Sequence, residues 1–473
     1  MKNNYIAILT LISFSYLFGA CKKQLDVYPS TTEVDGNIIT DAKSAATALN
    51  GVYYQFAAGG LDQSGVLSSL WYSVNEMVPS QLSGMFSYAY GGGGLDVHKY
   101  NSETQYIDVI WNNGYAIVNS ANGFLKNLTP LSPQKIVGKD QMIAEAKFMR
   151  AFGNSQLLLY YGQYYDTSSA YGIILKTDPV APDNLYQSRV SVAVAYDSIL
   201  ADLDNAIPHL PNTNTQIWYA NVWAAKLLKA RVLINRGSPS DYAQVIGLTN
   251  DIITNSSFSL EPNTKDLFWS KGLTSNEIML GVKPYPNQNW KWTNYIFNAY
   301  YGPNKFMKQL FTGDPRAAWC IQTVDAAYVT TTGFTKYYHG SVTDISATPI
   351  TENAYPFRLT EAYLLEAEAL AASGGSMNDA RTLLKTVMAH AGFTDFTAVD
   401  ATAIASDLQL LIVEEEMKNF VGEAGQDWLA LRRLPFATIQ SLLPSLKAQS
   451  LLILPIPQAE ITSNDKIKQN PNY

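Results

Sequence analysis

Apolar residues recur at helical spacing along two long stretches of this chain. Between residues 41 and 260 the pattern predicts helices at 41–57, 104–127, 139–161, 191–207, 218–236 and 241–255. Between 356 and 473 it predicts helices at 358–372, 377–391 and 403–420. Each helix is apolar on one face only, and paired antiparallel helices bury such faces by stacking. The sequence therefore predicts a mostly α-helical fold of tetratricopeptide-like helical hairpins.

Two stretches lose the helical pattern. Residues 58–103 are rich in Gly, Ser, Tyr and Trp, and residues 261–355 carry only two strand-like runs, at 277–282 and 328–338. Long irregular segments of this kind usually serve binding. Residues 451–473 are punctuated by proline and are expected to be extended. We expect 41–473 to form a single domain, with a helical-repeat part (41–260), an irregular loop part (261–355) and a carboxy-terminal helical part (356–473).

The amino terminus has the layout of a bacterial lipoprotein signal. Lys2 precedes an apolar run at 5–18, and the small residues Gly19 and Ala20 precede Cys21. The run is shorter than the ~20 apolar residues that a membrane-spanning helix needs. We therefore expect a signal peptide at 1–20, lipidation of Cys21 and a tether at 21–40. An ordinary secretory signal with an incidental cysteine is the alternative.

Composition narrows the classes of function. The formal charge of −7 gives no basic footprint for a phosphate backbone, so we expect no nucleic-acid partner. The 30 Tyr, 18 Phe and 9 Trp provide for a large aromatic core. Two cysteines make no disulfide framework, and the four histidines are far apart in sequence. We therefore expect no metal and no cofactor.

Charged residues on the alanine-rich helices have two interpretations, acid/base catalysis or ion pairing between packed helices. The residues in question are Glu145, Arg150, Arg358, Glu361, Glu366 and Glu368. No histidine or serine nucleophile accompanies them, and catalytic pairs usually lie on loops of a scaffold. The sequence contains no G-x-S-x-G motif, phosphate-binding glycine loop or zinc-ligand spacing. We expect ion pairs and no enzymatic activity; a glycoside hydrolase would need two carboxylates about 5–10 Å apart across a cleft.

Aromatic and amide residues in the irregular segments are the better candidates for function. Sugars present apolar C–H faces and a rim of hydroxyls, which flat aromatic rings and side-chain amides recognise. The candidate ligand-binding residues are Trp71, Tyr72, Asn75, Tyr88, Tyr90, Tyr285, Asn287, Trp290, Trp292 and Tyr295. Trp290 and Trp292 stand out because their loop is polar and proline-flanked, although they share a face only if that loop is extended. No Lys or Arg lies between Ser64 and Tyr90, which favours uncharged glycans.

Several segments resemble the SusD/RagB family of outer-membrane nutrient-binding lipoproteins. The segments that carry the resemblance are 48–53 (ALNGVY), 144–151 (AEAKFMRA), 313–316 (GDPR), 358–368 (RLTEAYLLEAE), 454–457 (LPIP) and 469–473 (QNPNY). They span nearly the whole chain in the family's order, and the ending is the most specific. Where many members carry Glu-Arg and then Glu-Gly, this chain has Glu415-Glu416 and Glu423-Ala424, which is typical of a divergent subgroup.

The resemblance implies a SusD-like fold, a place in polysaccharide utilisation and nutrient uptake, and binding without bond cleavage. Such a protein is anchored by lipid on Cys21 in the outer membrane and faces the extracellular side. It captures an oligosaccharide or polysaccharide and acts as the lid of a SusC-like TonB-dependent transporter. Two alternatives stay open: a peptide ligand, as in the RagB branch, and a helical-repeat adaptor that binds only proteins.

Overall fold

The computed structural model describes residues 38–91, 93–340, 348 and 350–473. The predicted signal peptide, the lipidation site Cys21 and the predicted tether as far as residue 37 lie outside these ranges. Within them, no helix combines the length and the hydrophobicity that a membrane crossing requires.

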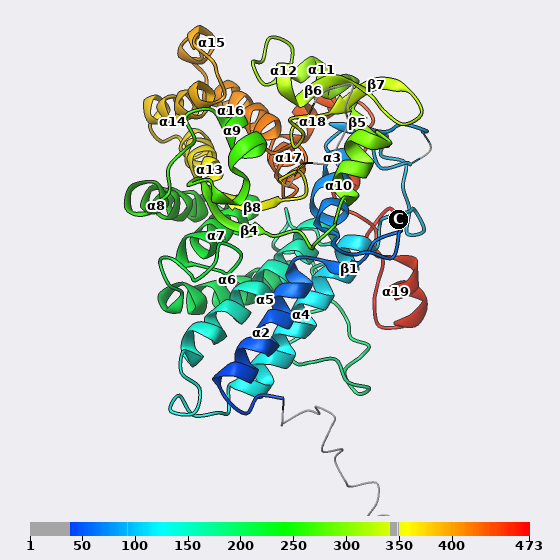
Figure 1. Cartoon of the computed structure of the whole chain (residues 1–473), viewed down its shortest axis with the longest axis vertical. Coiled ribbons are helices and arrows are strands. Elements are labelled where there is room, and N and C mark those ends of the chain that lie inside the picture. Colours follow the sequence, from blue (N-terminus) through cyan, green and yellow to red (C-terminus); the bar gives the residue numbers. More distant parts are fainter. Residues whose placement is uncertain (1–37, 92, 341–347, 349) are drawn as a thin grey trace, which may run out of the picture.

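All the predicted helices are present, which confirms the mostly α-helical fold class. The first stretch forms α2 (Ala42–Phe56), α4 (Val109–Leu128), α5 (Lys139–Tyr161), α6 (Val192–Ala206), η3 (Ile207–His209), α7 (Val222–Arg236) and α8 (Pro239–Asn255). The second stretch forms α13 (Leu359–Ala372), α14 (Met377–His390), α15 (Thr397–Asp400) and α16 (Ala405–Phe420). Consecutive helices pack on one another, and α13 packs on α8, α14 and α16, so the second stretch continues the stack of the first (Figure 1).

Capping residues explain several of the helix boundaries. The Asp41 carboxylate accepts a hydrogen bond from Ser44 N (2.7 Å) and so begins α2. The predicted helix at 218–236 starts four residues later than expected, because Asn221 has extended backbone and its side chain caps α7. Gly237, with a left-handed φ of 66°, ends that helix. Trp218 and Tyr219 therefore lie in the loop before α7 and not on its apolar face.

The irregular segments contain more short elements than the sequence pattern indicates. Residues 58–103 form β1 (Gly59–Leu61), β2 (Leu67–Ser69), the π-helix η2 (Ser73–Met77), α3 (Val78–Leu82) and β3 (Phe86–Tyr88). Residues 261–303 form α9 (Thr264–Asp266), η4 (Leu267–Lys271), η5 (Gly272–Thr274), β4 (Ile278–Val282), α10 (Trp290–Trp292), η6 (Thr293–Phe297) and β5 (Tyr301–Pro303). Residues 304–358 form α11 (Lys305–Leu310), α12 (Ala317–Cys320), β6 (Ile321–Asp325), β7 (Thr330–Phe334) and β8 (Ala354–Arg358). The two predicted strand-like runs correspond to β4 and β7.

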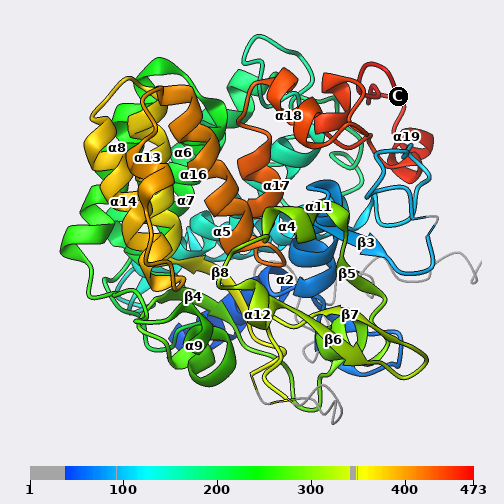
Figure 2. The same cartoon turned by 90° about the horizontal axis from the view of Figure 1, so that it is seen from above.

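The strands of the described residues pair as antiparallel ribbons, β1 with β2, β3 with β5, β4 with β8 and β6 with β7. The β3–β5 ribbon joins the two irregular segments, with Tyr88 opposite Tyr301 and Ser87 opposite Gly302. Figure 2 shows α8, α13 and α14 on one side of the molecule and β3, β5, β6 and β7 on the opposite side. The irregular segments thus meet away from the outer helices of the stack.

The carboxy-terminal segment is less extended than expected. It contains α17 (Gln426–Leu431), α18 (Phe436–Leu442), η7 (Gln449–Leu452) and α19 (Gln458–Ser463). Pro457 immediately precedes α19, and proline is compatible with the turn that leads into a helix. The expectation that 451–473 is extended throughout is therefore wrong.

Ion pairs connect the helices to one another and to neighbouring segments, as expected for most of the charged residues considered above. Arg358 pairs with Glu277 (2.8 Å) and Glu423 (2.9 Å). Glu361 pairs with Arg231 (2.7 Å). Further pairs join Arg150 to Asp202 (2.7 Å) and Arg433 to Glu368 (2.6 Å). The structure confirms ion pairing for Arg150, Arg358, Glu361 and Glu368. Glu145 accepts a hydrogen bond from Tyr53 instead, and Glu366 forms no salt bridge with any of the described residues.

Candidate functional site

Four tyrosines from the two irregular segments gather where β3 and β5 pair. We call Tyr88, Tyr90, Tyr300 and Tyr301 the tyrosine cluster. The ring centroids of Tyr88 lie 5.7 Å from Tyr90, 6.4 Å from Tyr300 and 5.3 Å from Tyr301, and Tyr90 lies 5.8 Å from Tyr300. Tyr90 is 65% exposed, while Tyr88 and Tyr300 are half-buried. The cluster therefore presents aromatic rings to the solvent.

Strand pairing brings these residues together. Residues directly opposite in an antiparallel pair share a face, and so do residues two apart along a strand. Tyr88 is opposite Tyr301, and Ala89 N donates to Tyr300 O (2.8 Å), which extends the pairing beyond β3 toward Tyr90. The turn between β6 and β7 is attached to the same segment, because Ala327 N donates to Phe297 O (2.7 Å). That turn carries Tyr328, which is 76% exposed.

A cavity of about 220 Å³ lies beside the cluster. Its lining combines rings, amides and bare backbone: Gln81, Tyr88, Gly91, Gly93, Leu95, Gln105, Tyr106 and Tyr301. The Tyr301 hydroxyl donates to the Tyr106 hydroxyl (3.4 Å), and burial raises the pKa of Tyr301, so this phenol stays protonated at neutral pH. The cavity therefore offers neutral hydrogen-bonding groups next to aromatic faces.

Aromatic rings beneath the cluster fix the two irregular segments to each other. Tyr72 packs edge-on against Tyr295 (5.8 Å) and against Trp290 (5.9 Å). Phe86 packs against Tyr295 (5.5 Å) and Phe334 (4.7 Å). The rings of Tyr72, which precedes η2, and of residues in β3, η6 and β7 thus form one layer. The tyrosine cluster lies over this layer.

A buried ion pair supports the same layer. Lys291 Nζ lies 3.0 Å from Glu76 Oε1, and both side chains are buried. Glu352 holds the start of α10, since its carboxylate accepts hydrogen bonds from Lys291 N (3.0 Å) and Trp292 N (2.7 Å). Burial raises the pKa of Glu76 to about 7, although Lys291 acts in the opposite direction.

The structure corrects the placement of four predicted residues. Trp71, Tyr72, Asn75 and Tyr295 are all buried, with at most 3% of each residue exposed. Trp71 packs against Phe56 (5.2 Å) in the core between α2 and the first irregular segment. These side chains are unavailable to a ligand, and we leave them out of the site. The sequence pattern missed this because the irregular segments have a buried side of their own.

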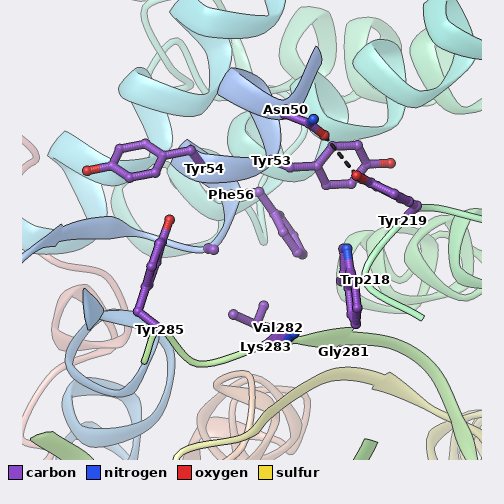
Figure 3. A pocket seen from close by; sticks show the side chains of 11 residues that line it. Asn50, Tyr53, Tyr54, Phe56, Trp218, Tyr219, Gly281, Val282, Lys283 and Tyr285 are labelled. Carbon is purple, nitrogen blue, oxygen red and sulfur yellow. Dashed lines mark hydrogen bonds between the residues drawn. The ribbon is translucent and has the colours of Figure 1, made fainter. Parts of the chain in front are cut away.

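The remaining predicted residues fall into separate places. Trp290 and Trp292 lie in the helical turn α10, so residues two apart point away from each other and make no shared platform. Trp292 is half-buried and stacks on Phe297 (5.0 Å). Asn287 is exposed, and Tyr285 lines a different cavity with Tyr54 and Trp218 (Figure 3). Only Tyr88 and Tyr90 of the predicted residues belong to the tyrosine cluster.

Sequence reasoning missed Tyr300, Tyr301, Tyr106 and Tyr328. The adjacent pair Tyr300-Tyr301 followed by Gly302 was a usable signal, because aromatic residues favour strands and a glycine in a strand often marks a bend or the close approach of a ligand. Within the described residues, no group of His, Cys, Asp and Glu is arranged to hold a metal ion. The arrangement suits stacking and hydrogen bonding of a neutral, hydroxyl-rich ligand.

Two sequence models of one family match this chain. Residues 63–234 match the SusD-like model described as "Starch-binding associating with outer membrane", and residues 285–439 match the SusD family model. A SusD-like protein of Bacteroides ovatus is 22% identical over 314 residues, which are 63% of this chain. The aligned part is 53% of that relative, so the chain spans about half the length of the curated relative that it matches.

Solved structures share the fold. A SusD superfamily protein from Bacteroides thetaiotaomicron has a TM-score of 0.72 and 21% identity, over 91% of this chain and 100% of that one. A laminarin-binding SusD-like protein has a TM-score of 0.70 and 20% identity, over 92% of this chain and 100% of that one. These structures show the common fold, and the segments matched by the two sequence models, which together cover more than half of the sequence, show that this chain belongs to the SusD/RagB family.

Proposed function

We propose that this protein is a surface lipoprotein that captures an oligosaccharide at the tyrosine cluster. The exposed ring of Tyr90 and the half-buried ring of Tyr300, beside a cavity lined by neutral polar groups, carry the proposal. Aromatic faces stack on the C–H faces of sugars, and amides such as Gln105 match their hydroxyls. The family description and the laminarin-binding neighbour support a glycan as the ligand class.

The role that we propose beyond ligand capture is the one expected of a member of this family. The protein is anchored in the outer membrane through lipid on Cys21 and hands its ligand to a SusC-like TonB-dependent transporter, for which it acts as a lid. It cleaves no bond in this process. Co-purification of a TonB-dependent β-barrel with the tagged protein from outer membranes supports this role, and its absence under mild detergent contradicts it.

Isothermal titration of the purified protein against soluble polysaccharides, laminarin included, tests the capture role. The double variant Tyr90→Ala/Tyr300→Ala should weaken binding at least tenfold, which corresponds to about 1.4 kcal/mol. The control Tyr186→Ala removes an exposed tyrosine outside the cluster and should leave the affinity unchanged. Equal binding by the double variant would move the glycan site elsewhere. Binding of peptides in place of glycans would favour the peptide-binding branch.

A further inference from the structure

Two neighbouring cavities lie along helix α2. Neither of them shares a lining residue with the cavity beside the tyrosine cluster. The first, of about 260 Å³, is the one shown in Figure 3, and the second has about 380 Å³. Asn50 and Tyr219 line both. We call the two cavities together the α2 groove.

Aromatic rings form the walls of the first cavity. Figure 3 shows Tyr54 and Tyr285 on one side of the space and Trp218 on the other, with Phe56 and Val282 between them. The rings of Tyr54 and Tyr285 are 6.4 Å apart at 75°. Tyr54, Trp218 and Tyr285 are each half-buried, so each ring keeps part of its surface open. They come from α2, the loop before α7 and the loop after β4.

The boundary between the two cavities is polar. The Tyr219 hydroxyl donates to Asn50 Oδ1 (2.9 Å), and Asn50 itself is exposed. In the second cavity, Gln141 Nε2 and Asn214 Nδ2 donate to Glu145 Oε1 at 2.9 and 3.3 Å. Burial raises the pKa of Glu145, which the hydrogen bonds from Tyr53, Gln141 and Asn214 partly oppose. Amides and a phenol, held in fixed orientations, therefore dominate the polar lining.

One exposed charge stands at the mouth of the first cavity. Lys283 Nζ lies 5.0 Å from the centroid of the Trp218 ring, and within the described part of the chain no carboxylate forms a salt bridge with it. The ammonium can therefore donate hydrogen bonds to a hydroxyl or ring oxygen of a bound ligand.

We propose that the α2 groove is a second carbohydrate-binding site, independent of the tyrosine cluster. One sugar ring lies between Trp218 and Tyr285, and the next ring lies across the Asn50–Tyr219 hydrogen bond against Gln141 and Asn214. The first cavity is smaller than the ~300–1,000 Å³ of a typical drug-sized pocket, which suits a single sugar ring. Open aromatic faces next to oriented amides are the combination that sugars require.

Isothermal titration with laminaritriose, maltotriose and xylotriose tests the proposal, because two sites that share no lining residue should each bind their own molecule of a short ligand. The wild type should bind two molecules of the recognised trisaccharide per protein. Tyr90→Ala/Tyr300→Ala and Trp218→Ala/Tyr285→Ala should each bind one. Tyr186→Ala is the matched control and should bind two.

A second readout separates loss of binding from loss of fold. Trp218 is in the α2 groove, whereas no tryptophan lines the cavity beside the tyrosine cluster. Ligand-dependent tryptophan fluorescence should therefore persist in Tyr90→Ala/Tyr300→Ala. The conservative variant Trp218→Phe keeps an aromatic ring, so it should restore at least half of the binding lost in Trp218→Ala while abolishing the fluorescence change.

The outcomes distinguish this inference from the proposed function. A single molecule bound by the wild type, with binding lost in Tyr90→Ala/Tyr300→Ala and unchanged in Trp218→Ala/Tyr285→Ala, overturns the second site alone. A single molecule bound, with the opposite dependence on the two variants, supports the α2 groove and overturns the tyrosine cluster as the site. If the wild type binds none of the three trisaccharides, the α2 groove proposal is rejected.

Discussion

Lys291 Nζ and Glu76 Oε1 lie 3.0 Å apart in the layer beneath the tyrosine cluster, and no more than 2% of either side chain is exposed. The two residues belong to different irregular segments, 215 positions apart in sequence. Lys291 also donates to Asn353 O (2.6 Å). The pair thus joins the two segments that carry the tyrosines.

Removing one member of this pair should destabilise the protein strongly. Lys291→Met leaves the Glu76 carboxylate buried without its cation, and breaking a buried pair in this way costs about 3–5 kcal/mol. The double variant Glu76→Met/Lys291→Met removes both charges and should recover most of the loss. Unfolding in urea at pH 9, above the pKa of about 7 that Glu76 has beside Lys291, measures both values. A double variant that is as unstable as Lys291→Met would contradict the assignment of the cost to the unpaired charge.

The Asp427 carboxyl should make stability depend on pH. Burial raises its pKa from 3.8 to about 6, while hydrogen bonds from Ser80 and Ser83 lower it. Between these values the native state holds more protons than the unfolded state, so stability falls as the pH rises from about 4 to about 6. The full effect is about 3 kcal/mol. Asp427→Asn should remove this part of the slope, measured as unfolding free energy at pH 4 and pH 6.5; an unchanged slope would exclude Asp427 as its source.

Lipidation of Cys21 should decide where the protein is found. Cys21→Ser removes the thiol to which we expect the lipid to be attached, so the variant should lose the acyl mass and leave the membrane fraction. Mass spectrometry and fractionation check the two effects separately. A variant that stays with the membrane at the same mass as the wild type would show that Cys21 is not the anchor.

Gly94 should be intolerant of a side chain. Its φ is 80°, and an added Cβ would lie 2.6 Å from Lys99 O. Gly94→Ala should therefore cost more than the about 1–3 kcal/mol of a strained backbone alone, and it should weaken glycan binding because Gly91 and Gly93 line the nearby cavity. Gly65→Ala is the control, with φ of 75° and open space around its Cβ. Equal melting temperatures for the two variants would refute the clash.

Helical periodicity was enough to predict the stack, and for α5 it gave both ends, Lys139 and Tyr161. It failed for α7, because a single asparagine, Asn221, begins that helix and leaves Trp218 in a loop. The apolar face of a helix is set by residues three and four positions apart, so it can be recognised in a short stretch of sequence. For this reason the helical stack could be predicted from the sequence.

Only part of the candidate site could be predicted from the sequence. Tyr88 and Tyr90 were identified as candidates, and their role as ligand contacts stays a prediction. Tyr72 and Tyr295 look the same in sequence, yet they pack on each other in the core. Which tyrosine is buried depends on contacts between residues far apart in the chain, such as the Lys291–Glu76 pair that joins the two segments. Periodicity carries no information about such contacts.

The β3–β5 ribbon has a consequence for exchanging specificity between members of the family. Residues 58–103 supply Tyr88 and Tyr90, and residues 261–355 supply Tyr300 and Tyr301, across strands that pair Phe86 with Pro303. If only one of the two segments were transferred to another family member, half of the cluster would be paired with a strand of the host protein. The transferable unit is both segments together, and a chimera should inherit the donor's ligand only when it receives the two as a matched set.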